Sequence, residues 1–200
     1  MKVVNRLVLA VSFMFASIAH ANVILSLDPA TQTTNTGDLV TVSVMIDGLG
    51  DGVPLSLSAF DLDIAFDSSA LSFVGYGLFD ELGGVIDGID LSWGEYIPGV
   101  INIAELSLLS NFDLWNFQPG SFTLAELFFT VDTAVTSAIA FVYADLVDVN
   151  GDTINIIGAN NASITGTNPV PTPAALTLMS LALLTMFVRK KYYPLGVKKS

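Results

Sequence analysis

Three oxygen-bearing side chains alternate around a glycine late in the chain. They are Asp148, Asn150 and Asp152, with Gly151 between the last two. Clustered carboxylate and amide oxygens are the ligands that Ca²⁺ prefers, so this segment is a candidate calcium site. It does not match an EF-hand loop, because no glutamate follows at the twelfth position. The same residues also favour a tight turn between strands, which is the alternative. No other cofactor is expected.

Aromatic side chains in loop-like segments are the second set of candidate functional residues. Trp93, Tyr96 and Trp115 lie in such segments. Tryptophan and tyrosine rings offer a large apolar face with a polar tip, which suits contact with a carbohydrate or a protein. We expect these three residues to contact such a ligand. The alternative is that they cover the ends of a hydrophobic core.

The stretch from Asn22 to Val188 holds no lysine, arginine or histidine, and the chain holds no cysteine. It therefore lacks a Ser–His triad, a thiol nucleophile, a Schiff-base lysine and a cationic clamp for phosphate. The remaining catalytic route is a carboxylate pair, as in glycoside hydrolysis, drawn from Glu81, Glu95, Glu105 and Glu126. No motif fixes a separation between them. We therefore predict a protein that is not an enzyme, with a glycosidase as a remote alternative.

All nineteen carboxylates also lie between Asn22 and Val188, so this stretch has a charge of −19. A polyanion repels phosphate backbones, which excludes nucleic acid as a partner. Salt bridges within the stretch and disulfides are excluded as well. Its stability must come from burial, backbone hydrogen bonds and any bound cation.

Residues 1–21 have the anatomy of a secretory signal. Lys2 and Arg6 precede an apolar run, and Ala19 and Ala21 are the small residues of a cleavage site. We expect cleavage after Ala21 and export of the mature chain. The alternative is an uncleaved N-terminal anchor.

Residues 22–166 are predicted to be all-β. Short runs of Val, Ile, Phe and Thr alternate in period two between Gly, Asp, Asn and Pro. About nine strands without a convincing helix predict an antiparallel sandwich of jelly-roll topology. A long loop, with at most a short helical turn, is expected over 79–99. The strand candidates are Val23–Leu27, Val40–Ile46, Phe60–Phe66, Leu71–Gly77, Val100–Leu108, Ser121–Val131, Ala138–Leu146, Thr153–Ile157 and Ala162–Thr165.

The C-terminal part is predicted to be a membrane anchor. A Pro/Thr-rich linker over 167–173 precedes fifteen apolar residues, 174–188. A basic cluster completes an anchor segment over 174–191, and the positive charge predicts a cytoplasmic tail over 192–200. A helix of this length is short for a bilayer, but flanking residues and bilayer thinning cover the difference. The alternative is a hydrophobic helix buried in the domain.

This tail resembles the PEP-CTERM sorting signal of Gram-negative bacteria. The resemblance covers a V-P-x-P-type motif at Pro171, Thr172 and Pro173, the apolar stretch, and a basic cluster at Arg189, Lys190 and Lys191. Thr172 stands where the family usually has glutamate. The resemblance implies processing by an exosortase-type enzyme. It also implies delivery to the cell surface or the extracellular matrix.

The middle of the chain resembles a cohesin domain. Gly37-Asp38-Leu39-Val40-Thr41-Val42 is similar to the family's G-D-x-V-x-V, and residues 60–74 are similar to its F-x-x-x-x-x-Y-D-x-x-x-L-x-F segment. Residues 125–129 are similar to the family's L-x-x-L-x-F strand, and residues 145–154 to its D-x-x-G-x-x-I turn. The resemblance implies a jelly roll that binds a dockerin on one sheet face and its edge.

These observations predict a non-catalytic binding module displayed on a Gram-negative cell. Its partner is expected to be a dockerin-like protein or a polysaccharide. The alternative is a structural protein of the extracellular matrix or biofilm without a specific ligand.

Overall fold

The computed structural model describes residues 23–50, 55–169 and 179–186. It divides the chain into two units, Met1–Thr167 and Asn168–Ser200. The predicted signal peptide with Ala19 and Ala21 lies outside the described residues. The sorting motif, the basic cluster and the tail over 192–200 also lie outside them.

Five strands of the first unit form one sheet, in the order β11-β1-β3-β9-β5. β1, β3, β9 and β5 pair antiparallel, whereas β11 runs parallel to β1. Their bounds are β1 Val23–Asp28, β3 Leu39–Asp47, β5 Leu71–Leu78, β9 Ser121–Val131 and β11 Ile156–Asn160.

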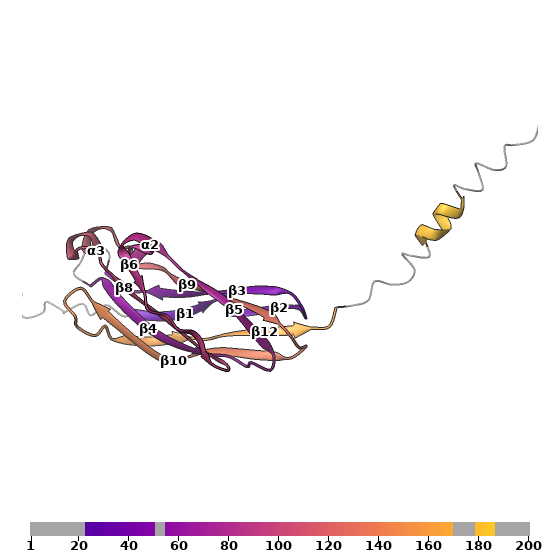
Figure 1. Ribbon diagram of the computed structural model, residues 1–200, viewed down its shortest axis with the longest axis horizontal. Helices are drawn as coiled ribbons and strands as arrows, with labels where there is room; N and C mark the ends of the chain where they lie inside the picture. Colours follow the sequence, from indigo (N-terminus) through magenta and orange to yellow (C-terminus); the bar gives the residue numbers. More distant parts are fainter. Residues whose placement is uncertain (1–22, 51–54, 170–178, 187–200) are drawn as a thin grey trace, which may run out of the picture. The chain divides into compact units, whose positions relative to one another are not determined.

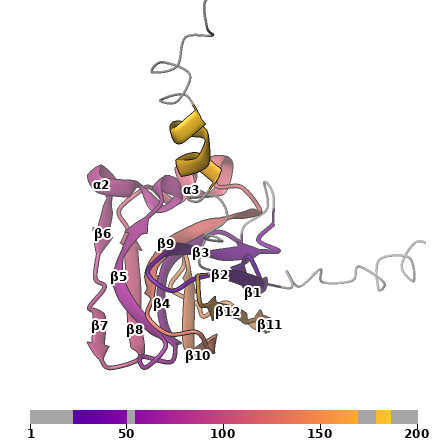
Figure 2. The ribbon, with the colours of Figure 1, turned by 90° about the vertical axis from the view of Figure 1, so that its right-hand side faces the viewer.

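Seven strands form the second sheet, in the order β2-β12-β10-β4-β8-β6, with β7 also paired to β8. The two sheets pack face to face (Figure 1), and β6 and β7 lie along the outer side of β8 (Figure 2). The predicted β-sandwich is thus confirmed. The bounds are β2 Thr31–Asn35, β4 Leu57–Ala65, β6 Gly88–Asp90, β7 Gly94–Ile97, β8 Val100–Ser107, β10 Thr136–Asp148 and β12 Ala162–Thr167.

The strand count and the strand directions correct the prediction. The described residues form twelve strands rather than nine, and the β1–β11 and β2–β12 pairs are parallel. β2, β6 and β7 were not predicted, because each lies at or near a sheet edge and lacks an alternating buried face. The local periodicity of a strand shows which of its residues share a face. It does not show whether the strand pairs parallel or antiparallel with its neighbour.

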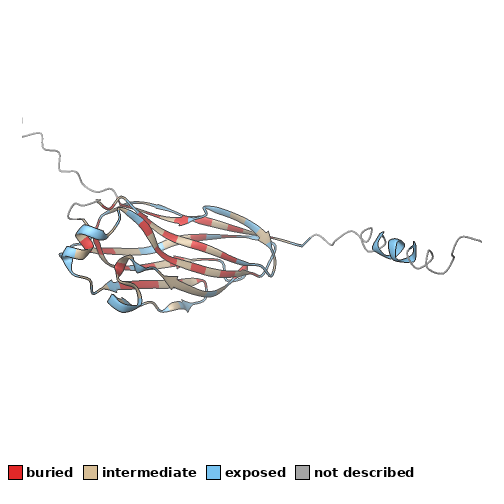
Figure 3. Cartoon of the chain, turned by 90° about the horizontal axis from the view of Figure 1, so that it is seen from above, coloured by how far each residue is buried: buried red, intermediate tan, exposed pale blue. Residues whose placement is uncertain are grey.

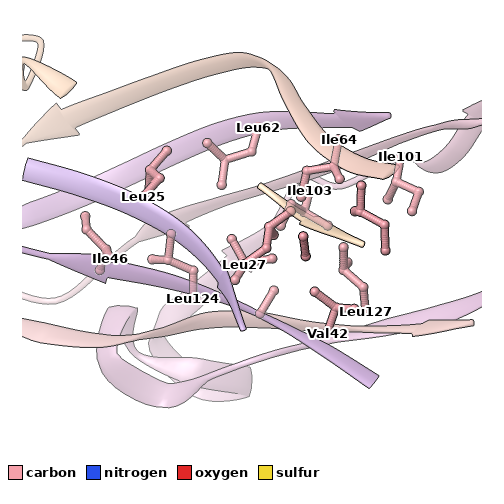
Figure 4. Packing of buried hydrophobic residues seen from close by; sticks show 14 of the residues in the cluster. Leu25, Leu27, Val42, Ile46, Leu62, Ile64, Ile101, Ile103, Leu124 and Leu127 are labelled. Carbon is pink, nitrogen blue, oxygen red and sulfur yellow. The ribbon is translucent and has the colours of Figure 1, made fainter. Parts of the chain in front are cut away.

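Alternate strand residues fill the space between the sheets. Burial alternates along β1, β3, β4 and β9. Figure 3 shows buried residues recurring along the strands, and the buried side chains form one continuous core (Figure 4). Phe129 lies within it, edge-to-face with Phe66 at 5.2 Å and with Phe73 at 5.8 Å between ring centroids. Burial of this apolar surface stabilises a domain that has no cation with which to form salt bridges.

Three short helical segments lie between the strands, where the sequence predicted only one helical turn. They are η2 Asp80–Leu82, α2 Gly84–Asp87 and α3 Asn111–Phe117. Ser110 caps α3, because its Oγ accepts a hydrogen bond from the Asp113 backbone N–H at 3.2 Å. With seven residues, α3 is too short for a 3.6-residue period to stand out.

In the second unit, the longest described stretch is 179–186. These residues are helical, and their apolar side chains are exposed. Across the described parts of the chain, we find no helix with both the length and the apolar character needed to cross a bilayer. Most of the predicted anchor, 174–191, falls outside them.

Candidate functional site

Two aspartates of β4 point away from the core. Asp61 and Asp63 alternate with Leu62 and Ile64, which are fully buried, so both carboxylates lie on the outer face of the seven-stranded sheet. This is the alternation that the sequence predicts for a strand with one solvated face. The aspartates are thereby presented to whatever approaches this face.

The register places two polar rows across three strands. Asp63 lies opposite Asn102 of β8 and Tyr143 of β10. Asp61 lies opposite Ala104 of β8 and Asp145 of β10. Three carboxylates, an amide and a phenol therefore share one small area, although they come from three strands that are far apart in the sequence.

Asn102 links the two aspartates of β4. Its Nδ2 donates hydrogen bonds to Asp61 Oδ1 at 2.7 Å and to Asp63 Oδ1 at 3.0 Å. The Tyr96 hydroxyl of β7 donates to Asp63 Oδ2 at 3.2 Å. Burial, this hydrogen bond and the charges of Asp63 and Asp61 raise the pKa of Tyr96, which keeps its hydroxyl a donor.

Trp93 stands beside this network. Its ring meets the ring of Tyr96 edge-to-face, with centroids 5.9 Å apart, and 76% of Trp93 is exposed. Its backbone N–H donates to Asn102 Oδ1 at 3.3 Å. The indole is thus held at the edge of β8 while its face stays open to solvent.

Together these residues line a groove of about 640 Å³. Its floor is formed by the outer faces of β4, β8 and β10, and one wall is formed by the segment that carries Trp93 and Tyr96. The lining consists of Ala59, Phe60, Asp61, Asp63, Leu91, Trp93, Tyr96, Asn102, Ala104, Glu105, Leu106, Tyr143, Asp145 and Val147.

Two of the three predicted contact residues, Trp93 and Tyr96, therefore come together in the groove. Trp115 does not line it and lies on α3 instead. Trp115 is half-buried, and its indole Nε1 has no hydrogen-bond partner among the described residues. Asp61, Asp63, Asn102, Tyr143 and Asp145 were not singled out from the sequence. The alternating Asp-Leu-Asp-Ile pattern was the one signal that could have found the first two.

Glu105 borders the groove but shares the inner side of β8 with the buried Ile101 and Ile103. Only 2% of it is exposed, although residues of β8 on either side of it face the groove. Burial, with the charges of Asp90, Asp80 and Glu81, raises its pKa to about 7. Its Oε1 lies against Gly88, where no larger residue leaves room for it.

Glu105 also lines a second cavity. It has a volume of about 470 Å³ and opens between β5 and β6, with Tyr76, Asp80 and Asp90 among its lining residues. The Tyr76 hydroxyl donates to Asp90 Oδ2 at 2.8 Å. Burial alone would raise the pKa of Asp90, but hydrogen bonds from Ser92 and Tyr76 hold it below its usual value.

The candidate calcium residues form a tight turn. Asp148 accepts hydrogen bonds from the Asn150 backbone N–H at 2.8 Å, from Asn150 Nδ2 at 3.0 Å and from the Asp152 backbone N–H at 2.9 Å. Gly151 has a φ of +86°, which glycine adopts without strain. Among the described residues, no three acidic or histidine side chains are grouped as metal ligands. Calcium binding at Asp148, Asn150 and Asp152 stays a prediction.

Comparison with known proteins identifies the fold. No protein-family model matches the chain, and no curated protein matches its sequence. Solved structures do match. CaCohA2 from Clostridium acetobutylicum is 24% identical over 78% of this chain and 97% of its own, with a TM-score of 0.59. A type II cohesin domain from the cellulosome of Acetivibrio cellulolyticus is 20% identical over 72% of this chain and 95% of its own, also with a TM-score of 0.59.

A third match is a complex. A type I cohesin–dockerin complex from Clostridium thermocellum matches with 11% identity over 73% of this chain and 99% of the matched one, with a TM-score of 0.58. These matches show that the β-sandwich has the cohesin-like fold. They confirm the fold implied by the sequence resemblance.

Proposed function

We propose that the sandwich is a non-catalytic binding module that holds a protein partner, a dockerin-like chain, on the outer face of β10, β4 and β8. The observation that carries the proposal is the groove on that face, where Trp93 and Tyr143 are exposed among fixed polar groups. Exposed aromatic anchors within a polar rim are typical of protein interfaces. Cohesins of the same fold form complexes with dockerins, which supports the class of partner.

The carboxylates of the domain give little support to catalysis. Glu105 has the raised pKa that suits a general acid, but only 2% of it is exposed. Glu126 lies on the five-stranded sheet, away from the groove. A glycosidase therefore stays the remote alternative. Hydrolysis of a glycan that is lost in Glu105→Gln would revive it.

A polysaccharide is the second candidate ligand. The open face of Trp93, set against Tyr96, is a surface on which a sugar ring can stack. Asp61, Asp63 and Asn102 offer hydrogen-bonding groups to its hydroxyls. A structural matrix protein without a specific ligand is the third possibility, and it requires no groove.

The setting of the module is also a proposal. Export by the N-terminal signal, sorting by an exosortase-type enzyme and anchoring by the C-terminal segment would display the domain on a Gram-negative cell. The exposed apolar side chains of the helical residues 179–186 are compatible with an anchor. Cell fractionation before and after removal of residues 170–200 tests this part.

Site-specific photo-crosslinking tests the binding face. A photoreactive phenylalanine analogue replaces Tyr143 in the groove or Val74 on β5, two positions with 50% and 58% exposure. In cells that make the protein, we expect a discrete crosslinked protein from position 143 and none from position 74. Equal crosslinking from both positions, or none from either, would contradict the proposal. A crosslink to glycan alone would favour the polysaccharide.

A further inference from the structure

The groove holds more hydrogen-bond acceptors than its own donors satisfy. The amide of Asn102 and the hydroxyl of Tyr96 already donate to Asp61 and Asp63. Among the described residues, no hydrogen bond reaches the carboxylate of Asp145, directly opposite Asp61 on the neighbouring strand. Carboxylates accept hydrogen bonds at both oxygens, so the groove offers several unfilled positions to a donor.

These acceptors also lack a counter-charge. Side chains directly opposite on antiparallel strands are about 5 Å apart at Cβ, and like charges there repel. Asp61 and Asp145 are such a pair, and the stretch from Asn22 to Val188 has no cationic side chain that could compensate them. The cation that relieves this repulsion must therefore come from another molecule or from outside that stretch.

The aromatic wall narrows the choice of cation. Trp93 lines the groove and is 76% exposed, and its ring meets the ring of Tyr96 edge-to-face. A guanidinium group stacks on the face of an exposed indole ring. Its planar fork of five N–H donors also forms bidentate hydrogen bonds with carboxylates. An ammonium group satisfies the charge but not the planar fork. A neutral sugar supplies hydroxyl donors but leaves the charges of Asp61, Asp63 and Asp145 uncompensated.

We propose that the partner is anchored by an arginine side chain, stacked on Trp93 and held by the carboxylates of Asp61, Asp63 and Asp145. This inference rests on the proposed function, because it names the chemistry by which a protein partner occupies the groove. It predicts a partner that presents a basic residue at the centre of its contact surface.

Indole NMR resonances test the inference directly. The chain has two tryptophans, so ¹⁵N-labelled full-length protein in mild detergent gives two indole N–H signals, which Trp115→Phe assigns. The probes are N-acetyl-arginine amide and its neutral isostere N-acetyl-citrulline amide, in buffer with EDTA. We expect the arginine compound to shift the Trp93 signal with millimolar affinity and the citrulline compound to leave it unmoved.

Matched variants locate the effect. Asp63→Asn should weaken the arginine response at least several-fold, whereas Glu126→Gln, which removes one charge from the other sheet, should keep it. Equal responses to arginine and citrulline, or no response to arginine, would overturn the inference. A response to cellohexaose without one to arginine would overturn it in favour of a sugar. If crosslinking from position 143 succeeds while the arginine response is missing, the binding face stands and the arginine anchor does not.

Discussion

The hydroxyl of Tyr96 on β7 donates a hydrogen bond to Asp63 on β4 at 3.2 Å, across 33 residues of sequence. β8 lies between these two strands in the sheet, so the bond spans the floor of the groove. The bond links Tyr96, in the wall of the groove beside Trp93, to Asp63 in its floor. The groove is therefore held in shape before any partner arrives, which lowers the entropic cost of binding.

Alanine substitutions of Trp93 and Trp115 should differ in their effect on stability. Trp93→Ala removes a ring that is 76% exposed, so we expect its melting temperature to stay within about 1 °C of the parent. Trp115→Ala removes a half-buried ring and should cost about 2 kcal/mol, or several degrees. Thermal unfolding followed by circular dichroism measures both. A large loss of stability in Trp93→Ala would show that its ring belongs to the core.

Gly88→Ala should destabilise the domain. A Cβ at this position would collide with Glu105 Oε1 and would lie 2.6 Å from the carbonyl oxygen of Gly84. Because one of these neighbours is backbone, relief requires the chain to move, and we expect a loss of about 2 kcal/mol in chemical denaturation. Gly75→Ala is the control, since nothing lies within 4 Å of its Cβ position. Equal stability of the two variants would contradict the close approach of Glu105 to Gly88.

The stability of the domain should depend on Glu105 between about pH 5 and 7. Its pKa is raised from 4.5 to about 7 in the folded state, so unfolding releases a proton in this window and stability falls as the pH rises. Glu105→Gln should remove this slope and gain roughly 2 kcal/mol at pH 8.

The pH dependence due to Glu105 can be distinguished from that of the other carboxyl groups in two ways. The carboxyl groups with lowered pKa, among them Asp38 and Asp67, change stability below about pH 4, outside the window. Glu126→Gln is the matched substitution and should keep the parental slope. Denaturation midpoints at pH 5 and pH 8 decide the matter, and a Glu105→Gln variant with an unchanged slope would refute the assignment.

Removal of calcium tests the loop at Asp148. Burial alone would raise the pKa of Asp148, but hydrogen bonds from the Asp152 backbone and from Asn150 hold it below its usual value. These hydrogen bonds favour the tight turn, which is the alternative to a calcium site, so we expect EDTA to leave the melting temperature unchanged. A fall of several degrees that calcium reverses and magnesium does not would establish the calcium site instead.

The sandwich follows from the sequence because its central strands carry their own pattern. Leu62 and Ile64 alternate with Asp61 and Asp63, and that period of two allows only a strand with one solvated face. β2 offers no such pattern: its Thr-rich residues have no buried face, and it pairs only with β12 at the edge. Its pairing is a tertiary property that local pattern does not reveal.

The groove was predicted only in part for a similar reason. Trp93 and Tyr96 stood out by residue type in a loop-like segment, and they do meet. Asp145 belongs to the site because the register of β10 on β4 sets it opposite Asp61. Register is fixed by pairing over the whole strand, so the sequence near Asp145 does not reveal it. Trp115 shares the type and setting of Trp93, and only the position of α3 excludes it.

Cysteine labelling on intact cells tests the central claim most directly. The chain has no cysteine, so Tyr143→Cys and Val74→Cys each carry one thiol, at positions of 50% and 58% exposure. A membrane-impermeant maleimide should label both equally in the purified protein. On cells that make the partner, we predict that position 143 is labelled several-fold more slowly than position 74. Equal labelling of the two positions on cells would show that the outer face of β10, β4 and β8 is uncovered, and would contradict its role as the binding surface.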